Sequence, residues 1–144
     1  MFFGEYEHTI DAKGRVIIPA RLREELGETF VITKGLDNCL SIYPMEQWTA
    51  VEEKLQSMPM SQPEVRAFVR FFFSGAAEGE LDKQGRVMLP PNMREHARLT
   101  KDVVIAGAGN RLEIWDRDTR DQYLTSTASP EEMAAKMSEL GFLI

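Results

Sequence analysis

Apolar and polar positions follow the same order twice along this chain. In each copy a short segment, at 8–10 or 79–81, leads into a turn with a glycine, and a run of three apolar residues follows at 16–18 and again at 87–89. Such short continuous runs predict buried strands. A proline ends each run and predicts the start of a short helix, because its fixed φ suits the first helical position. Gly27 is placed to end the first of these helices.

Two further strands are expected in each copy. Apolar segments lie at 30–32 and 40–43 in the first copy and at 103–105 and 112–115 in the second. Turn-forming residues, including Gly35 and Gly107, separate the two segments of each copy. The pattern therefore predicts the same small β-rich unit twice.

Helices are expected after each set of strands. Apolar residues with helical spacing, which we expect to pack in the core, are Met45, Trp48, Val51 and Leu55, then Val65, Phe68, Val69 and Phe72, and finally Met133, Met137 and Leu140. Ser61–Glu64 and Ser129–Glu132 have the spacing of capping boxes, and Gly141 predicts the end of the last helix.

The two copies also match residue by residue. Identical pairs are Asp11/Asp82, Gly14/Gly85, Arg15/Arg86, Val16/Val87, Pro19/Pro90, Arg23/Arg94 and Glu24/Glu95. A chance match of this length is implausible, so the chain is an internal duplication. We predict an α+β fold of two modules, residues 1–73 and 74–144, each with trailing helices.

Two apolar runs predict self-association. The three aromatic residues at 71–73 cannot all face one side of a helix, so part of this run is expected to pack on the other module or on a neighbouring subunit. The apolar residues 142–144 at the C-terminus indicate the same, because chain ends are usually polar.

The net charge of −6 at first argues against a nucleic-acid partner. The charges are segregated, however. The segment 12–23 carries Lys13, Arg15, Arg21 and Arg23 and no acid. Binding depends on where the cations lie as much as on their sum, so double-stranded DNA is retained as a candidate partner.

Other classes of site have little support. No apolar run approaches the roughly 20 residues of a membrane helix, and the N-terminal segment lacks a secretory signal, so we expect a cytoplasmic protein without a membrane partner. With one cysteine and two histidines, neither a disulfide framework nor a zinc site is expected. Cys39 can in principle act as a nucleophile, but a small apolar side chain beside a strand is the favoured interpretation.

The repeated Asp-x-x-Gly-Arg turn is the candidate site. Its aspartate, Asp11 or Asp82, can accept hydrogen bonds from turn amides or pair with the arginine that follows. An arginine ordered in this way is suited to a phosphate or a guanine edge. The alternative is that aspartate and arginine only close the turn, and spacing alone favours it. Lys13 and Lys83, near the turns, favour DNA.

Three further cations, Arg21, Arg23 and Arg94, lie on the predicted short helices and are either solvated charges or additional contacts.

An enzyme is not expected. Paired aspartates in a duplicated β protein suggest an aspartic protease, in which two carboxylates share a proton. That family follows each aspartate with Thr or Ser and then Gly, whereas Ala12 and Lys83 follow here. The neighbouring cations would also lower both carboxyl pKa values. We therefore predict no catalytic residue and no cofactor, metal or small-molecule substrate.

Several motifs together resemble the MraZ family. They are the tandem elements Asp11–Arg15 and Asp82–Arg86, the segment Gly-Leu-Asp-Asn-Cys-Leu-Ser-Ile-Tyr-Pro at 35–44, and Arg-Phe-Phe-Phe-Ser-Gly at 70–75. The resemblance covers essentially the whole chain and is weakest after Trp115. It implies two fused modules of the swapped-hairpin β-barrel type, similar to the AbrB and SpoVT regulators, which form a pseudo-dimer within one chain.

The resemblance also implies a function. Such a protein is a sequence-specific transcriptional regulator, chiefly a repressor, that forms a ring-shaped homo-oligomer at the nucleoid. It binds direct repeats upstream of the division and cell-wall gene cluster.

Carried over by position, Arg15 and Arg86 are the principal DNA contacts, and Lys13 and Lys83 lie beside them. The lysines are offset by one position, because Gln84 stands where the first copy has Lys13. The aspartates and glycines of both turns have positioning roles.

A second class of function stays open. The same modules can hold a protein partner, as an antitoxin-like or scaffolding unit does. DNA binding weakens steeply with salt, whereas binding through an apolar interface does not, so a salt series separates the two hypotheses.

Overall fold

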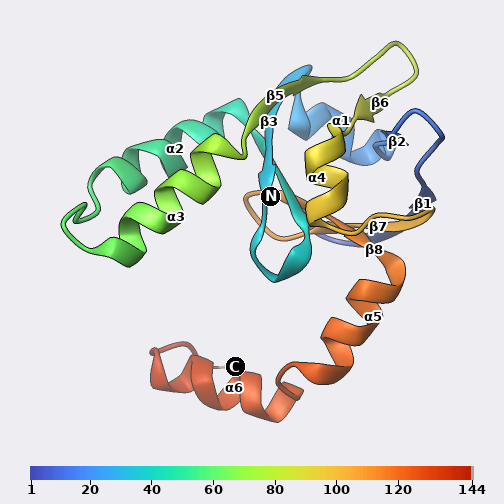
Figure 1. Ribbon diagram of the computed structural model, residues 1–144. Helices are drawn as coiled ribbons and strands as arrows, with labels where there is room; N and C mark the ends of the chain where they lie inside the picture. The colour runs from blue at the N-terminus through green and yellow to red at the C-terminus, as the bar shows by residue number, and fades with distance from the viewer. Residues whose placement is uncertain (144) are drawn as a thin grey trace.

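The computed structural model describes residues 1–143 as a mixed α+β fold in which one order of elements occurs twice (Figure 1). The first copy contains β1 (Glu5–Thr9), β2 (Arg15–Ile17), α1 (Ala20–Leu26), β3 (Thr29–Lys34), the 3-10 turn η1 (Leu36–Asn38), β4 (Leu40–Pro44), α2 (Met45–Gln56) and α3 (Pro63–Ser74). The second contains β5 (Ala77–Glu80), β6 (Arg86–Met88), α4 (Pro91–His96), β7 (Asp102–Gly107), β8 (Leu112–Asp116), α5 (Arg117–Ser126) and α6 (Pro130–Glu139). The expected α+β duplication is confirmed at this level.

The two copies exchange strands. The main sheet has six antiparallel strands in the order β1-β7-β8-β4-β3-β5. In it β1 of the first copy pairs with β7 of the second, and β5 of the second pairs with β3 of the first. The first strand of each copy thus lies against the third strand of the other. Neither copy completes its part of the sheet alone.

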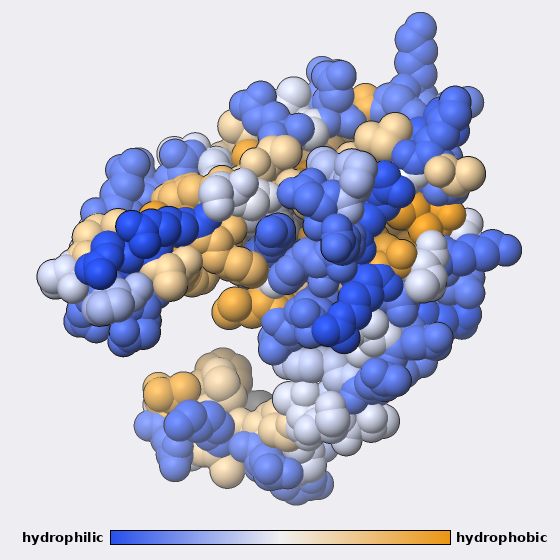
Figure 2. Space-filling view, in the orientation of Figure 1, coloured by the Kyte–Doolittle hydropathy of each residue, from blue (hydrophilic) through white to orange (hydrophobic). Residues whose placement is uncertain are grey.

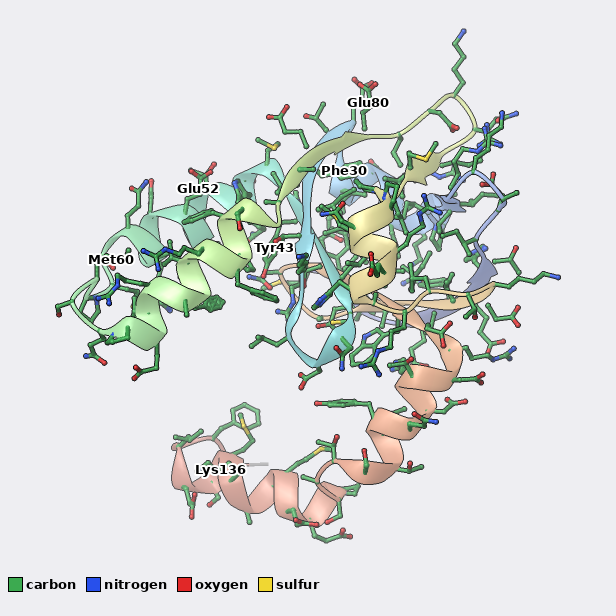
Figure 3. All side chains as sticks on the ribbon, in the orientation of Figure 1. Phe30, Tyr43, Glu52, Met60, Glu80 and Lys136 are labelled. Atoms are coloured by element: carbon green, nitrogen blue, oxygen red, sulfur yellow. The ribbon has the colours of Figure 1, made fainter. Side chains whose placement is uncertain are left out.

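The hydrophobic core is shared in the same way. One cluster of buried residues draws on both copies, from Val16 and Phe30 to Val87 and Ile105. The side chains of β3 alternate between this cluster and a second one, where Val31 packs with Trp48 of α2 and Phe72 of α3. Phe30 lies on the core side of β3, and Tyr43 lies toward α3 (Figure 3).

The strands β2 and β6 form a separate two-stranded antiparallel ribbon. At its centre Val16 lies opposite Val87, and both are fully buried. Beyond the paired residues, Ile18 donates its N–H to the carbonyl of Gly85 at 2.9 Å, and Leu89 donates to Gly14 at 2.9 Å. Each strand therefore ends against the turn of the other copy.

The expectation of fully buried strands at 16–18 and 87–89 is wrong for the middle residue of each run. Ile17 is 42% exposed and Met88 is 50% exposed, whereas Ile18 and Leu89 are buried. The ribbon packs only one face on the core, and successive side chains of a strand point to opposite faces. The second residue of each apolar run consequently faces outward.

Most of the sequence signals for helix ends are confirmed. Gly27 caps α1 with a φ of 83°, and Ser129 forms a complete capping box with Glu132 at the start of α6. Gly141, with a φ of 91°, follows the end of α6. The capping box expected at Ser61 is wrong, because α3 begins at Pro63 and its N-cap makes no side-chain capping bond.

The stripe on α6 does not pack in the core of this chain, contrary to expectation. Met133, Met137 and Leu140 are 47%, 40% and 71% exposed. The helices α5 and α6 form an arm that extends away from the sheet (Figure 1). The aromatic run at 71–73 behaves as predicted, since Phe72 is buried and Phe71 packs edge-on against His96 of the second copy.

A stability prediction follows from the close approach at Gly85. Its φ is +76°, and an added Cβ would collide with the guanidinium of Arg23. Gly109 has a φ of +82° and open space around the same position. Both Gly→Ala variants should lose about 1 kcal/mol from the left-handed backbone. Gly85→Ala should lose about 1 kcal/mol more, because Arg23 must leave the carbonyl of Ile18.

Urea unfolding of the two variants and the wild type measures this difference. Equal losses at the two positions would contradict a close contact between Arg23 and the second turn.

Candidate nucleic-acid interface

Asp11 organises the first turn through both of its carboxylate oxygens. Oδ1 accepts the backbone N–H of Lys13 and of Arg15, each at 2.9 Å. Oδ2 accepts Nε–H of the Arg15 side chain at 2.7 Å. Gly14, with a φ of 86°, reverses the backbone between them. The two roles that the sequence allows for this aspartate, binding turn amides and binding the arginine, occur together.

The second turn has the same geometry. Asp82 accepts the backbone N–H of Gln84 at 2.9 Å and of Arg86 at 2.8 Å, and Oδ2 accepts Nε–H of Arg86 at 2.8 Å. Gly85 has a φ of 76°. The sequence identity of the two turns thus extends to their hydrogen bonds.

In both turns the aspartate binds the arginine through Nε, which leaves Nη1 and Nη2 at the tip of the guanidinium for another partner. The side chains of Arg15 and Arg86 are 26% and 25% exposed. Each arginine is therefore held in one orientation while its tip stays accessible. Such ordering reduces the conformational entropy lost on binding a phosphate or a base edge.

The same contacts act on the aspartates. Hydrogen bonding from the backbone N–H of Arg15 is the largest cause that lowers the pKa of Asp11, and the guanidinium lowers the pKa further. Arg86 lowers the pKa of Asp82 in the same way. Both groups are carboxylates at neutral pH, each paired with its own arginine. This arrangement differs from a dyad whose two carboxyls share one proton.

The ribbon brings the two arginines onto one surface. In its register Arg15 lies opposite Met88, and Arg86 lies opposite Ile17. These four residues point away from the core, because Val16 between them points inward. The two arginines therefore occupy diagonal corners of the outer face of the ribbon.

Two more arginines reach this region across the copies. Arg23 on α1 donates Nε–H to the carbonyl of Ile18 at 2.6 Å, and its guanidinium lies against Gly85 of the second copy. Arg94 on α4 mirrors it, with a bond to the carbonyl of Leu89 at 3.0 Å and its guanidinium against Gly14. These two cations are thus part of the turn region and not freely solvated.

Sequence reasoning left the roles of Arg23 and Arg94 open and missed the cross-copy contact. The one sequence signal for this contact was that the same glycine and the same arginine occur in both copies, as Gly14 and Arg23 and as Gly85 and Arg94. Arg21 differs, because it is exposed and its guanidinium lies 5.5 Å from the ring centre of Phe3.

The lysines near the two turns are not placed equivalently. Lys13 and Lys83 are both exposed at the turns but stand one position apart in the repeat. Acids border the second turn. Glu28, Glu80 and Lys83 line a hollow beside it, and Glu80 lies where the strand leads into that turn (Figure 3). The two turns consequently share a hydrogen-bonding pattern but differ in local charge.

Other candidate chemistry is limited. Cys39 is buried, its thiol lies 3.1 Å from the carbonyl of Leu36, and burial, together with the nearby Glu113 carboxylate, raises its pKa to about 12. The interpretation of Cys39 as a small buried side chain is confirmed. Within residues 1–143, no three His, Cys, Asp or Glu residues are grouped for a metal ion. None of the helices described there combines the length and apolar character needed to cross a bilayer.

Fold and site together define a duplicated α+β protein whose halves exchange strands and jointly present an arginine-bearing ribbon. The family described as "MraZ protein, putative antitoxin-like" matches residues 1–71 and again residues 72–140. The chain belongs to the MraZ family.

Similar proteins cover nearly the full length of the chain. A relative from Moorella thermoacetica is 60% identical over 138 residues, which span 95% of this chain and 96% of the relative. Relatives from Clostridium tetani and Acetivibrio thermocellus are 54% and 56% identical, each over 98% of this chain and 99% of the relative. Each of these three proteins bears the name transcriptional regulator MraZ.

The lowered carboxyl pKa values predict how the turns respond to acid. The pKa of Asp82 is lower in the folded protein than in the unfolded chain, so its ionised form stabilises the fold above the unfolded-chain value, and this contribution disappears as the pH falls through the folded value. Asp82→Asn should therefore destabilise the protein at neutral pH, and the penalty should shrink below about pH 4.

Urea unfolding from pH 7 downward measures this penalty, with Asp121→Asn on the exposed surface of α5 as the matched control. A penalty that stays constant with pH would show that the Asp82 carboxylate does not hold the turn.

Proposed function

We propose that this protein is a sequence-specific DNA-binding transcriptional regulator without catalytic activity. The observation that carries the proposal is the pair of carboxylate-ordered arginines on the outer face of one two-stranded ribbon. A ribbon of this kind fits the major groove of B-DNA. The names of the relatives support a role in transcription.

Each turn residue has a defined part in this proposal. Arg15 and Arg86 bind phosphates or guanine edges through their Nη atoms, and Lys13 and Lys83 add phosphate contacts. The aspartates order the arginines, and Gly14 and Gly85 allow the tight reversal that places them. The proposed ligand of this site is double-stranded DNA, and the proposal involves no cofactor, metal ion or small-molecule substrate.

The exchange of strands between the two copies suggests how the modules are built. We propose that residues 1–73 and 74–144 are two modules of the swapped-hairpin β-barrel type that form a pseudo-dimer. The pairing of β1 with β7 and of β5 with β3 supports this interpretation, because each module contributes its first strand to the other.

Membership in the family supports a specific target. We propose that the protein acts in the cytoplasm at the nucleoid and binds direct repeats upstream of the division and cell-wall gene cluster. Repression is the proposed outcome, since a protein bound across a promoter excludes the polymerase.

Two separate apolar surfaces support self-association. Met133, Met137 and Phe142 leave one side of the α5–α6 arm apolar. Leu55, Met58, Val65, Phe68 and Val69 line a groove on the hairpin of α2 and α3. Figure 2 shows apolar side chains on the side of the arm that faces this hairpin. We propose that the arm of one copy fills the groove of the next.

An interface between two different surfaces joins subunits head to tail, and such a chain closes into a ring when the rotation permits. A ring explains how a chain with negative net charge can bind DNA, because the assembly brings together several locally basic ribbons. Once one ribbon of the ring has bound its DNA site, the neighbouring ribbons are held at a high effective concentration near the adjacent sites, which raises the overall affinity. Acids elsewhere on the surface oppose non-specific binding.

The DNA proposal predicts that Arg15→Ala/Arg86→Ala binds a labelled duplex carrying the repeats upstream of the protein's own gene at least about tenfold more weakly than the wild type. The slope of log K against log salt should also become less steep, by about 0.9 for each phosphate that the variant no longer neutralises. Fluorescence anisotropy across a salt series measures both quantities.

The matched control is Lys54→Ala/Arg70→Ala, which removes two exposed cations from α2 and α3. The tip of this hairpin, marked by Met60, lies across the molecule from the ribbon (Figures 1 and 3). The control should bind as the wild type does. Wild-type binding without preference over random DNA, or an unaffected arginine variant, would refute the proposal and favour the antitoxin-like role of holding a protein partner.

The assembly proposal predicts that Met133→Glu/Met137→Glu lowers the molar mass in solution, because two carboxylates cannot be buried in an apolar groove. Light scattering after size-exclusion chromatography measures the mass. Ala135→Glu/Ser138→Glu adds the same charge to other exposed positions of α6 and should leave the mass unchanged. Equal masses for the two variants would place the interface elsewhere.

A further inference from the structure

Two apolar side chains occupy the outer face of the ribbon between the arginines. Ile17 is 42% exposed and Met88 is 50% exposed. The fold does not use these positions to build its core, since the ribbon is anchored by Val16 and Val87, which are fully buried on the opposite face. Polar residues at these two outward positions would leave that anchor intact.

The register gives the outer face a fixed pattern. Ile17 lies directly opposite Arg86, and Met88 lies directly opposite Arg15. Each apolar side chain is therefore a cross-strand neighbour of an ordered arginine, at about 5 Å between Cβ atoms. The two apolar side chains are diagonal to each other, at about 7–8 Å, which is roughly two base-pair steps of 3.4 Å.

This pattern matches one surface of DNA. Phosphates offer charge but no apolar group, and the minor groove exposes only hydrogen-bonding edges. The floor of the major groove exposes the C5-methyl group of thymine beside donors and acceptors of neighbouring bases. A face that alternates guanidinium and apolar side chains is complementary to that floor.

We propose that Ile17 and Met88 read thymine methyl groups in the major groove and so contribute to sequence specificity. This inference rests on the proposed function, because it names bases that the same ribbon contacts. A protein partner fits the pattern less well, since specific protein interfaces bury about 800 Å² on each side. On this face the two apolar side chains lie opposite Arg15 and Arg86.

Deleting single methyl groups from the DNA tests the inference without changing the protein. The probe is a duplex that the wild type selects from a randomised library, in which each thymidine is replaced in turn by deoxyuridine. At one or more positions per bound site, wild-type affinity should fall about three- to fivefold, the effect of one buried methyl-sized group.

Variants of the protein then test whether Ile17 and Met88 are the residues that contact the methyl groups. Ile17→Ser/Met88→Gln should bind the thymidine duplex less tightly and lose its sensitivity to deoxyuridine, while its salt slope stays equal to that of the wild type. Ile17→Val/Met88→Leu keeps the face apolar and should retain the sensitivity. Arg15→Ala/Arg86→Ala should instead change the salt slope.

The outcomes separate this inference from the proposed function. Specific, arginine-dependent binding that ignores every deoxyuridine substitution would overturn the methyl readout and leave DNA binding in place. Equal deoxyuridine sensitivity in the polar and apolar variants would also overturn it, because the methyl groups would then meet other residues. Failure of the wild type to select any duplex would overturn both proposals.

Discussion

The exchange of first strands between the two copies is the constraint on which the rest of the structure depends. Without β5, the edge of β3 would leave backbone N–H and C=O groups unpaired, and β7 would lose β1 in the same way. The exchange also fixes where the ribbon forms, because β2 follows β1 and β6 follows β5. The candidate site therefore belongs to neither half of the chain and exists only when both halves have folded together.

Local sequence signals predicted most of the elements, because strands, glycine reversals and proline helix starts depend on a few neighbouring residues. The pairing of Asp11 with Arg15 was also accessible, since both lie in one turn. Packing between the copies was not. The position of Arg23 against Gly85, and the exposure of Ile17, depend on which face of the ribbon meets the core. The apolar stripe of α6 was misassigned for a related reason, since periodicity shows that a face is apolar and not what covers it.

The turns combine rigidity with accessibility at little cost to the fold. Each aspartate uses backbone amides that a tight turn must satisfy in any case, and its remaining oxygen orders an arginine. Because the charges in each turn nearly cancel locally, two arginines can lie close together on a short ribbon without strong mutual repulsion. Many of the acids of the chain lie on the helices α2, α5 and α6 and not on the ribbon itself.

Fusion of the two copies in one chain has a consequence for orientation. Two identical subunits would present a ribbon with true twofold symmetry and would suit a palindrome. Here Lys13 corresponds by position to Gln84, and Glu80 borders only one of the turns, so rotating the ribbon by half a turn produces a different surface. A ribbon with distinguishable ends has a polarity, and copies aligned along a duplex would all point the same way. Head-to-tail DNA sites are the natural counterpart of such a protein.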